Sequence, residues 1–157
     1  MAKIDDLKAI LQEVRDRFET IKKEAGEEIG IDDFDLDGES LRTPRLHSRW
    51  LGVLSDEGIK LKQLQGIQKK LFLERWKYYQ GKATDKYYAE HGQVHDKIMK
   101  TDLDIYLGAD DMLCVMKEIM EVQGEVVNFL ERTVKEISSR TFHIKSAIDW
   151  RRFQAGN

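Results

Sequence analysis

The chain has 157 residues, of which 26 are Lys or Arg and 29 are Asp or Glu, so its formal net charge is −3 and its length suits one domain. Its single proline favours a nearly all-helical protein and argues against a β-sandwich or barrel, because proline interrupts helices. The one cysteine, Cys114, excludes an intramolecular disulfide. No apolar run reaches the roughly 20 residues of a spanning helix, and the start lacks a signal-peptide pattern, so we expect a cytoplasmic protein that does not enter a membrane.

The small net charge conceals blocks of opposite sign. Residues 1–40 carry 6 basic and 13 acidic side chains, whereas residues 41–82 carry 10 basic and 3 acidic ones. Residues 83–131 have a net charge of −7, and residues 132–157 have a net charge of +4. Because screening limits the reach of a charge to about 8–10 Å at physiological salt, the basic middle is the first candidate for binding an anionic partner.

The first 42 residues are predicted to form an acidic helix and a linker. An a/d pattern over 1–29 predicts an acidic amphipathic helix that could pair as a coiled coil, with its seam formed by Ile4, Leu7, Leu11, Val14, Phe18 and Ile21. Gly26 and Gly30 end this helix. The acidic run over 30–42 has no helical period, so we expect a linker there.

Residues 43–100 are predicted to form a basic helical region that binds DNA. Thr43 followed by Pro44 is typical of a helix start, with Thr as the N-cap and Pro in the first turn. An apolar face then continues, through a restart at residues 55–57, to a stop at Gly81. A second helix capped by Thr84 or Asp85 and ending near residue 101 would complete a helical hairpin.

Residues 101–157 are predicted to contain a long helix of about 35 residues followed by a separate basic C-terminal helix. The apolar stripe is too wide for a small monomer to cover, which favours a second subunit as its partner. The residues predicted to serve oligomerisation are Ile105, Met112, Met116, Ile119, Val126, Leu130, Ile137, Phe142, Ile148, Trp150 and Phe153.

The basic stretch over 60–82 combines cations with aromatic rings. Cations contact phosphates and exposed rings stack on unpaired bases, which is a sequence-tolerant way to bind single strands. The residues predicted to bind DNA are Lys60, Lys62, Lys69, Lys70, Arg75, Lys77, Tyr78, Tyr79 and Lys82. The alternative interpretation is a solvated helix face above a packed one, and Glu74 within the stretch weakens the case for DNA.

Motifs for catalysis and cofactors are weak or missing. Neither glycine-rich phosphate loop occurs in the sequence, and no catalytic triad can be assembled. His91 and His95 share the i, i+4 spacing of zinc proteases, but Gly92 stands where the catalytic Glu should be. Cys114 on a long apolar helix is typical of a small buried hydrophobe. We therefore expect no enzyme, metal or cofactor, with a His91/His95 metal hydrolase as a remote alternative.

Several short runs, in order along residues 46–157, resemble the UvsY recombination mediator family of T-even-type phages. The first are Leu46–Leu51, Gln68-Lys69-Lys70, and Arg75 with Tyr78–Gly81. The later ones are Met99–Thr101, Leu107–Asp110, Ile137–Phe142, Ile144-Lys145 and Phe153–Gly156. Their common order and the shared tail make chance similarity a poor explanation.

The resemblance implies a protein that is not an enzyme, binds single-stranded DNA and forms a homo-hexameric or homo-heptameric ring. It also implies two protein partners, a RecA-like recombinase and the single-strand DNA-binding protein whose coat the mediator weakens. The family's basic motif for DNA contact maps onto Lys69, Lys70 and Arg75. Leu73 replaces one of its lysines, and Lys77 stands where the family pattern is acidic.

The resemblance also ties the C-terminal helix to subunit assembly, in agreement with the apolar excess over 101–153. The acidic segment 1–42 is longer than in the family, and the resemblance implies no role for it. From the residues alone, a helical scaffold or coiled-coil adaptor without nucleic-acid binding remains the alternative, because the N-terminal heptads and the mixed charge would suffice for it.

Overall fold

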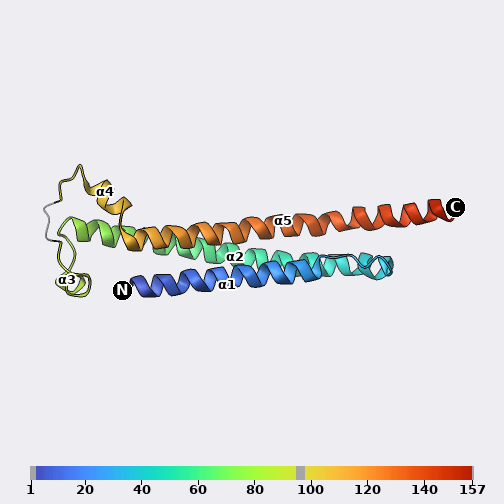
Figure 1. Ribbon diagram of the computed structural model, residues 1–157, viewed down its shortest axis with the longest axis horizontal. Coiled ribbons are helices and arrows are strands. Elements are labelled where there is room, and N and C mark those ends of the chain that lie inside the picture. Colours follow the sequence, from blue (N-terminus) through green and yellow to red (C-terminus); the bar gives the residue numbers. More distant parts are fainter. Residues whose placement is uncertain (1–2, 95–97, 157) are drawn as a thin grey trace. The chain divides into compact units, whose positions relative to one another are not determined.

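A computed structural model describes residues 3–94 and 98–156, and within these ranges the chain forms five helices and no strand. They are α1 (Ile4–Glu28), α2 (Leu36–Tyr79), α3 (Asp85–His91), α4 (Leu103–Gly108) and α5 (Asp111–Gln154) (Figure 1). The predicted all-α fold class is confirmed. None of these helices is both long and apolar enough to cross a bilayer.

The chain divides into two compact units, and the three long helices contribute a segment to each. Unit 1 contains α1 up to Val14, α2 from Lys60, α3, α4 and α5 up to Val122. Unit 2 contains α1 from Arg15, α2 up to Ile59 and α5 from Gln123. Within each unit, α2 runs antiparallel to α1 and α5 (Figure 1).

The core of unit 1 is a small cluster of aliphatic and thioether side chains from all three long helices. It consists of Leu7 and Leu11 on α1, Leu71 on α2, and Met112, Met116 and Ile119 on α5. Burying one such side chain contributes roughly 1.5–3 kcal/mol. The N-terminal seam predicted to pair as a coiled coil is thus filled within the chain.

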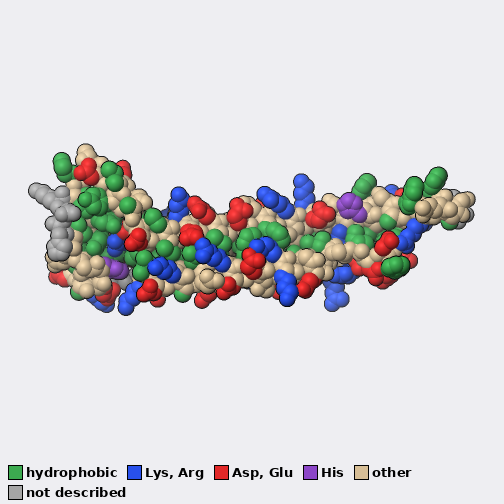
Figure 2. Space-filling view, in the orientation of Figure 1, with side chains coloured by type: hydrophobic (Ala, Val, Ile, Leu, Met, Phe, Trp, Pro, Cys, Tyr) green, Lys and Arg blue, Asp and Glu red, His purple; other side chains and the backbone are tan. Residues whose placement is uncertain are grey.

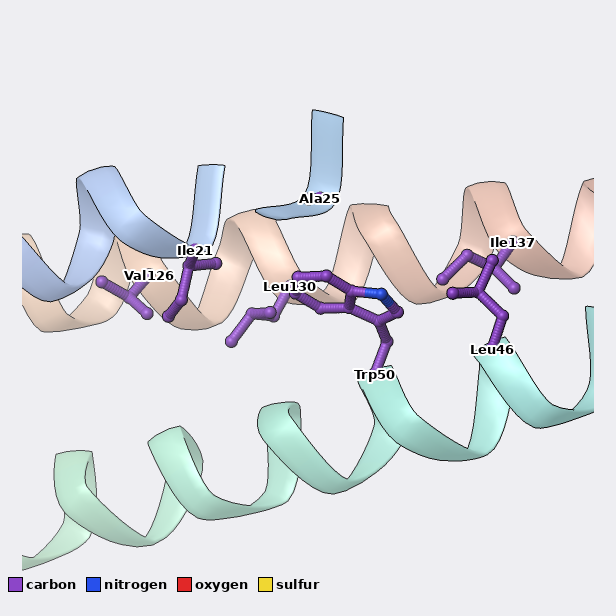
Figure 3. Close-up of a cluster of buried hydrophobic side chains, with 7 residues drawn as sticks. All are labelled: Ile21, Ala25, Leu46, Trp50, Val126, Leu130 and Ile137. Atoms are coloured by element: carbon purple, nitrogen blue, oxygen red, sulfur yellow. The ribbon is translucent and has the colours of Figure 1, made fainter. Parts of the chain in front are cut away.

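The core of unit 2 surrounds an indole ring on α2. Trp50 and Leu46 pack with Ile21 and Ala25 of α1 and with α5, which contributes Val126, Leu130 and Ile137 (Figure 3). The Trp50 Nε1 donates a hydrogen bond to Glu28 Oε2 at 3.1 Å, so the one polar atom of the ring is satisfied. Two of the three helices are therefore joined by both apolar and polar contacts at one residue.

Two buried charged side chains tie unit 2 together. Arg140 of α5 donates hydrogen bonds to Glu39, to the Thr43 hydroxyl at 3.3 Å and to the carbonyl oxygens of Ile29 and Gly30, the latter at 2.8 Å. The second charge, the Glu57 carboxylate, is buried and accepts hydrogen bonds at 3.2 Å from Arg17 Nε and at 3.0 Å from Gln123 Nε2. Each buried charge has partners, as an ionised group in a protein interior requires.

The predicted linker over 30–42 and the predicted start at Pro44 are both wrong in part. Residues 36–42 are the first turns of α2, and Pro44 lies inside that 44-residue helix. Asp35 begins it, because its carboxylate accepts from the Gly38 N–H at 3.0 Å and its carbonyl accepts from the Glu39 N–H at 3.0 Å. The Thr43 hydroxyl, predicted to cap a helix, instead donates to the Glu39 carbonyl at 2.9 Å.

The predicted stop and cap around residue 81 are confirmed. Gly81 has φ 71° and the Lys82 N–H bonds to the Lys77 carbonyl at 2.9 Å, a six-to-one bond that closes the end of α2. The Thr84 side chain accepts from the Tyr87 N–H at 3.3 Å and so caps α3. The next helix is shorter than predicted, because α3 ends at His91, followed by Gly92 with φ 82°.

The C-terminal region differs from the prediction in where its long helix begins and ends. It begins at Asp111, not near residue 101, because the Asp110 carboxylate caps it by accepting the Leu113 N–H at 3.0 Å. It then continues without a break to Gln154, so the predicted separate C-terminal helix is part of α5.

Candidate nucleic-acid interface

Three exposed lysines lie on one face of α2 in unit 1. Lys62, Lys69 and Lys77 are spaced by seven and eight residues, which at 3.6 residues per turn keeps them on one side of the helix. They span about 22 Å along the axis at 1.5 Å per residue. We call these three residues the lysine stripe, and their spacing suits several phosphates along one strand.

The remaining predicted lysines are also exposed. Lys60 and Lys70 lie on α2, and Lys82 follows its C-terminus. The Lys82 ammonium lies 5.0 Å from the centre of the Trp76 ring and donates to Gln80 Oε1 at 2.8 Å. The structure therefore leaves all six predicted lysines at the surface.

Arg75, predicted to contact DNA, is instead an internal residue with 8% of its surface exposed. Its Nε and one terminal nitrogen each lie 2.7 Å from Asp110 Oδ2, and its other terminal nitrogen donates to the Tyr87 hydroxyl at 3.4 Å. The guanidinium also stacks over the Tyr78 ring at 4.2 Å. The prediction fails because the partner, Asp110, lies 35 residues away in the sequence.

The electrostatics of this cluster favour a permanently charged Arg75. Burial lowers the pKa of the guanidinium, but hydrogen bonds to Tyr87 and Asp110 and attraction to the Asp110 carboxylate outweigh it, so the pKa lies above its ordinary value. Asp110 thus has two tasks, since one carboxylate oxygen caps α5 and the other holds Arg75.

The two tyrosines predicted to stack on bases make contacts within the chain. Tyr78 is buried, and its ring packs edge-on against Tyr79 at 5.2 Å between centres. Tyr79 is partly exposed, but its hydroxyl donates to Asp110 Oδ2 at 2.8 Å. Burial, followed by the hydrogen bond to Asp110, raises the pKa of Tyr79 to about 12. Both tyrosines therefore support the end of α2.

Asp110 belongs to this site but is not among the residues predicted for it. Its signal was available, because an Asp directly before a long apolar period is a typical N-cap. The same signal could not have shown the contact with Arg75, since that contact depends on how α2 and α5 meet in unit 1.

The residues predicted to serve oligomerisation fall into two sets. Six are buried inside the chain and cannot meet a second subunit: Met112, Met116, Ile119, Val126, Leu130 and Ile137. The other five are Ile105, Phe142, Trp150 and Phe153, which are exposed, and Ile148, which is half-buried. Figure 2 shows hydrophobic side chains projecting from the C-terminal end of α5.

No metal centre is found among the residues that the structure describes, because no group of three or more His, Cys, Asp or Glu side chains is placed to hold an ion. His95 lies outside the described residues. His91 packs on the Tyr87 ring at 4.3 Å between centres, and its buried Nε2 has no hydrogen-bond partner. Burial, and then repulsion by Arg75, lowers the pKa of His91.

The helices of the described residues present an exposed lysine stripe, which is a surface suited to a polyanion. These two features define the class as helical proteins with a basic face. Residues 24–157 match the model of a family described as recombination, repair and ssDNA binding protein UvsY. Because this match covers most of the chain, the protein belongs to the UvsY family. The description names no catalysed reaction.

The relatives agree in sequence and in fold. The recombination protein uvsY of Enterobacteria phage T4 is 25% identical over 140 residues, which cover 89% of this chain and 98% of the relative. A crystal structure of the bacteriophage T4 recombination mediator protein UvsY superposes with a TM-score of 0.74 at 25% identity, covering 87% of this chain and 96% of that one. A second crystal form gives a TM-score of 0.73, with coverage of 87% and 98%.

The N-terminal helix extends beyond the family match. The matched region begins at residue 24, within α1, so the segment that supplies Leu7 and Leu11 to the core of unit 1 lies outside it. In this chain, residues 4–23 of α1 therefore pack on α2 and α5 outside the matched region.

Proposed function

We propose that this protein binds single-stranded DNA through the lysine stripe and acts as a recombination mediator. In this role it loads a RecA-like recombinase onto strands coated by a single-strand DNA-binding protein. The family description includes ssDNA binding, and the T4 relative is called a recombination mediator protein. The observation that carries the proposal is the alignment of Lys62, Lys69 and Lys77 on one exposed face of α2.

A ring of six or seven copies would strengthen binding that is weak in one protomer. A strand held by one stripe meets the next at high effective concentration, so the affinities combine. A strand spread over several stripes is bent and partly exposed, which opposes a second protein's coat and offers a start site for a recombinase filament. No nucleotide hydrolysis by this chain is needed in that scheme.

The DNA contact is tested by replacing the three stripe lysines with glutamine and titrating a fluorescent oligo(dT) at several salt concentrations. Each lost phosphate contact removes about 0.7 from the slope of log affinity against log salt, so the triple variant should be shallower by about 2 per protomer. The matched control replaces Lys8, Lys23 and Lys135, which are also exposed, and should retain the slope.

An unchanged slope in the stripe variant would contradict the proposed surface. Absence of any oligonucleotide binding by the unmodified protein would contradict the function and favour a scaffold or adaptor. The N-terminal seam does not support that alternative, because Leu7, Leu11 and Ile21 are buried within the chain.

The mediator role is tested with a RecA-like recombinase and a single-strand DNA-binding protein from one phage system. We expect this protein to shorten the lag before the recombinase hydrolyses ATP on coated strands, and the stripe variant to lose this effect. Equal lags with and without the protein would contradict the mediator role while leaving the DNA-binding result in place.

A further inference from the structure

An open groove adjoins the lysine stripe in unit 1. Its volume is about 620 Å³, within the roughly 300–1,000 Å³ of sites that hold small molecules. The apolar walls are Phe72 of α2, Leu107 of α4 and Leu113 of α5, and the charged residues of the groove are Lys69, Lys117 and Asp104. Figure 2 shows hydrophobic side chains gathered over α4. We call this cavity the α2–α4–α5 groove.

Phe72 is the aromatic ring that this groove presents to solvent. It is 49% exposed, whereas Tyr78 is buried and the hydroxyl of Tyr79 is held by Asp110. Phe72 follows Lys69 by three residues, which places the two side chains about 5–6 Å apart at their Cβ atoms on one side of α2. A cation beside an exposed ring is the pairing that single-strand binding uses.

The charges at the groove favour an anionic occupant that approaches along the stripe. Lys69 belongs to both the stripe and the groove, so a backbone held by the stripe passes the groove's edge. The Lys117 Nζ lies 3.8 Å from the Glu121 Oε1, and both side chains are well exposed, so this ion pair is weak. The Asp104 carboxylate repels a phosphate near it, so the strand would reach the groove from the side where Lys69 lies.

We propose that the α2–α4–α5 groove binds unpaired bases of single-stranded DNA, with a base stacked on Phe72 and the adjoining phosphate on Lys69. This inference rests on the proposed function and adds a base-binding site to a surface otherwise defined by phosphate contacts. Stacking is tolerant of sequence because every base has an aromatic face, so the site selects single strands over duplex without reading sequence.

The first test compares normal and abasic oligonucleotides of equal length on the intact protein. Phe72→Ala should weaken binding of the normal strand by roughly 5- to 150-fold for one stacked base, and should leave abasic binding and the salt slope unchanged. Phe72→Trp should retain the wild-type affinity. Leu73→Ala is the matched control, since Leu73 is 50% exposed on the same helix but lies outside the groove.

A loss of affinity that is equal for normal and abasic strands, or equal for Phe72→Ala and Leu73→Ala, would overturn the base site. Both results leave the phosphate contacts of the stripe standing. If the unmodified protein binds neither strand, the proposed function itself fails, which is a different outcome.

The second test uses Cys114, the chain's single cysteine, which was predicted to be buried but is exposed and lines the groove. We expect a saturating normal oligonucleotide to slow its reaction with a disulfide reagent by at least tenfold, and a saturating abasic strand to leave it unchanged. An unchanged rate with a bound normal strand would overturn the proposal. A Cys114 reaction that is slow without DNA and becomes fast on dilution would also overturn it, because a second copy of the chain would then occupy the groove.

Discussion

At the scale of single residues, the contact between Arg75 and Asp110 fixes the end of α2 against the start of α5. Both side chains are nearly inaccessible to solvent, and the carboxylate oxygen that binds Arg75 also accepts from the Tyr79 hydroxyl. A buried ion pair of this kind is costly to break, because either partner alone remains charged without compensation. Arg75 thus holds the end of α2 to the residue that caps α5.

Removing the guanidinium should therefore lower stability. We expect Arg75→Ala to reduce the free energy of unfolding in urea by about 3–5 kcal/mol, because Asp110 is left buried and unpaired. Lys70→Ala, which removes an exposed cation from the same helix, should change it by less than about 0.5 kcal/mol. A stable Arg75→Ala protein with a shallower salt slope for single-stranded DNA would show that Arg75 contacts DNA after all.

We expect His91 to make the stability of the protein depend on pH. Its pKa is lowered in the folded protein, chiefly by burial and then by Arg75, although Glu90, Glu74 and Asp110 act in the opposite direction. Below about pH 6.5 the unfolded chain binds a proton that the folded chain resists, so this contribution to stability is present above pH 6.5 and is lost as the pH falls.

We expect His91→Phe to reduce the fall in melting temperature between pH 7.5 and pH 5.5 while keeping a ring against Tyr87. His143→Phe removes an exposed imidazole from unit 2 and should leave the wild-type difference between the two pH values in place. Identical pH dependence in the His91 variant and the unmodified protein would assign the effect to other groups.

At the scale of helices, Pro44 is a local defect inside α2. It has no N–H to donate to the carbonyl of Ser40 four residues earlier, and a proline in a helix interior costs roughly 3 kcal/mol. The helix persists because Asp35 caps it and because Arg140 binds Glu39 and Thr43 in the turn that precedes Pro44.

Pro44→Ala should consequently stabilise the protein, by up to about 3 kcal/mol in urea unfolding, because the new N–H completes the helix. The control is Arg45→Ala, a change at the next exposed position that should shift stability by less than about 0.5 kcal/mol. If Pro44→Ala destabilised the protein, proline would be acting as a helix start, as the sequence pattern suggested.

Local sequence patterns predicted the existence of the helices well, but they predicted some helix boundaries poorly. The periods of α1 and α5, the stop at Gly81 and the cap at Thr84 follow from nearest neighbours along the chain. The start of α2 does not, because the Thr43-Pro44 pattern is stronger locally than the cap at Asp35, and the contact that decides the matter comes from Arg140, 97 residues after Thr43.

The same distinction holds for the candidate site. The lysine stripe was predictable because helical spacing, which places its residues on one face, depends on one helix alone. The burial of Arg75 and Tyr78 was not, because Asp110 lies directly before α5 and Tyr87 lies on α3, both outside α2. The exposure of the Phe72 ring could not be predicted for the same reason, because it depends on where α4 lies against α2.

At the scale of the whole molecule, a net charge of −3 is compatible with DNA binding because the charges are segregated along the chain. The stripe lies in the block 41–82, where basic residues outnumber acidic ones, and local fields act over about 8–10 Å. Assembly would bring several such stripes together and make the local positive charge larger than any single chain offers. That step requires a surface on each protomer that is free to meet another.

We propose that the exposed apolar residues near the end of α5 provide that surface. Phe142, Trp150 and Phe153 are 70%, 60% and 72% exposed, and the last two rings stack at 5.7 Å between centres. Changing all three to Ser should convert the proposed ring to monomers in native mass spectrometry, with little change in unfolding free energy because few internal contacts are lost. Affinity for single-stranded DNA should then fall by roughly 100-fold or more, since the stripes no longer share one strand.

The control changes three exposed apolar residues elsewhere in unit 2 to Ser, namely Leu41, Leu51 and Ile59, and should preserve the assembly. If the α5 variant kept its oligomeric mass and the control lost it, the subunit contact would lie on α2 instead.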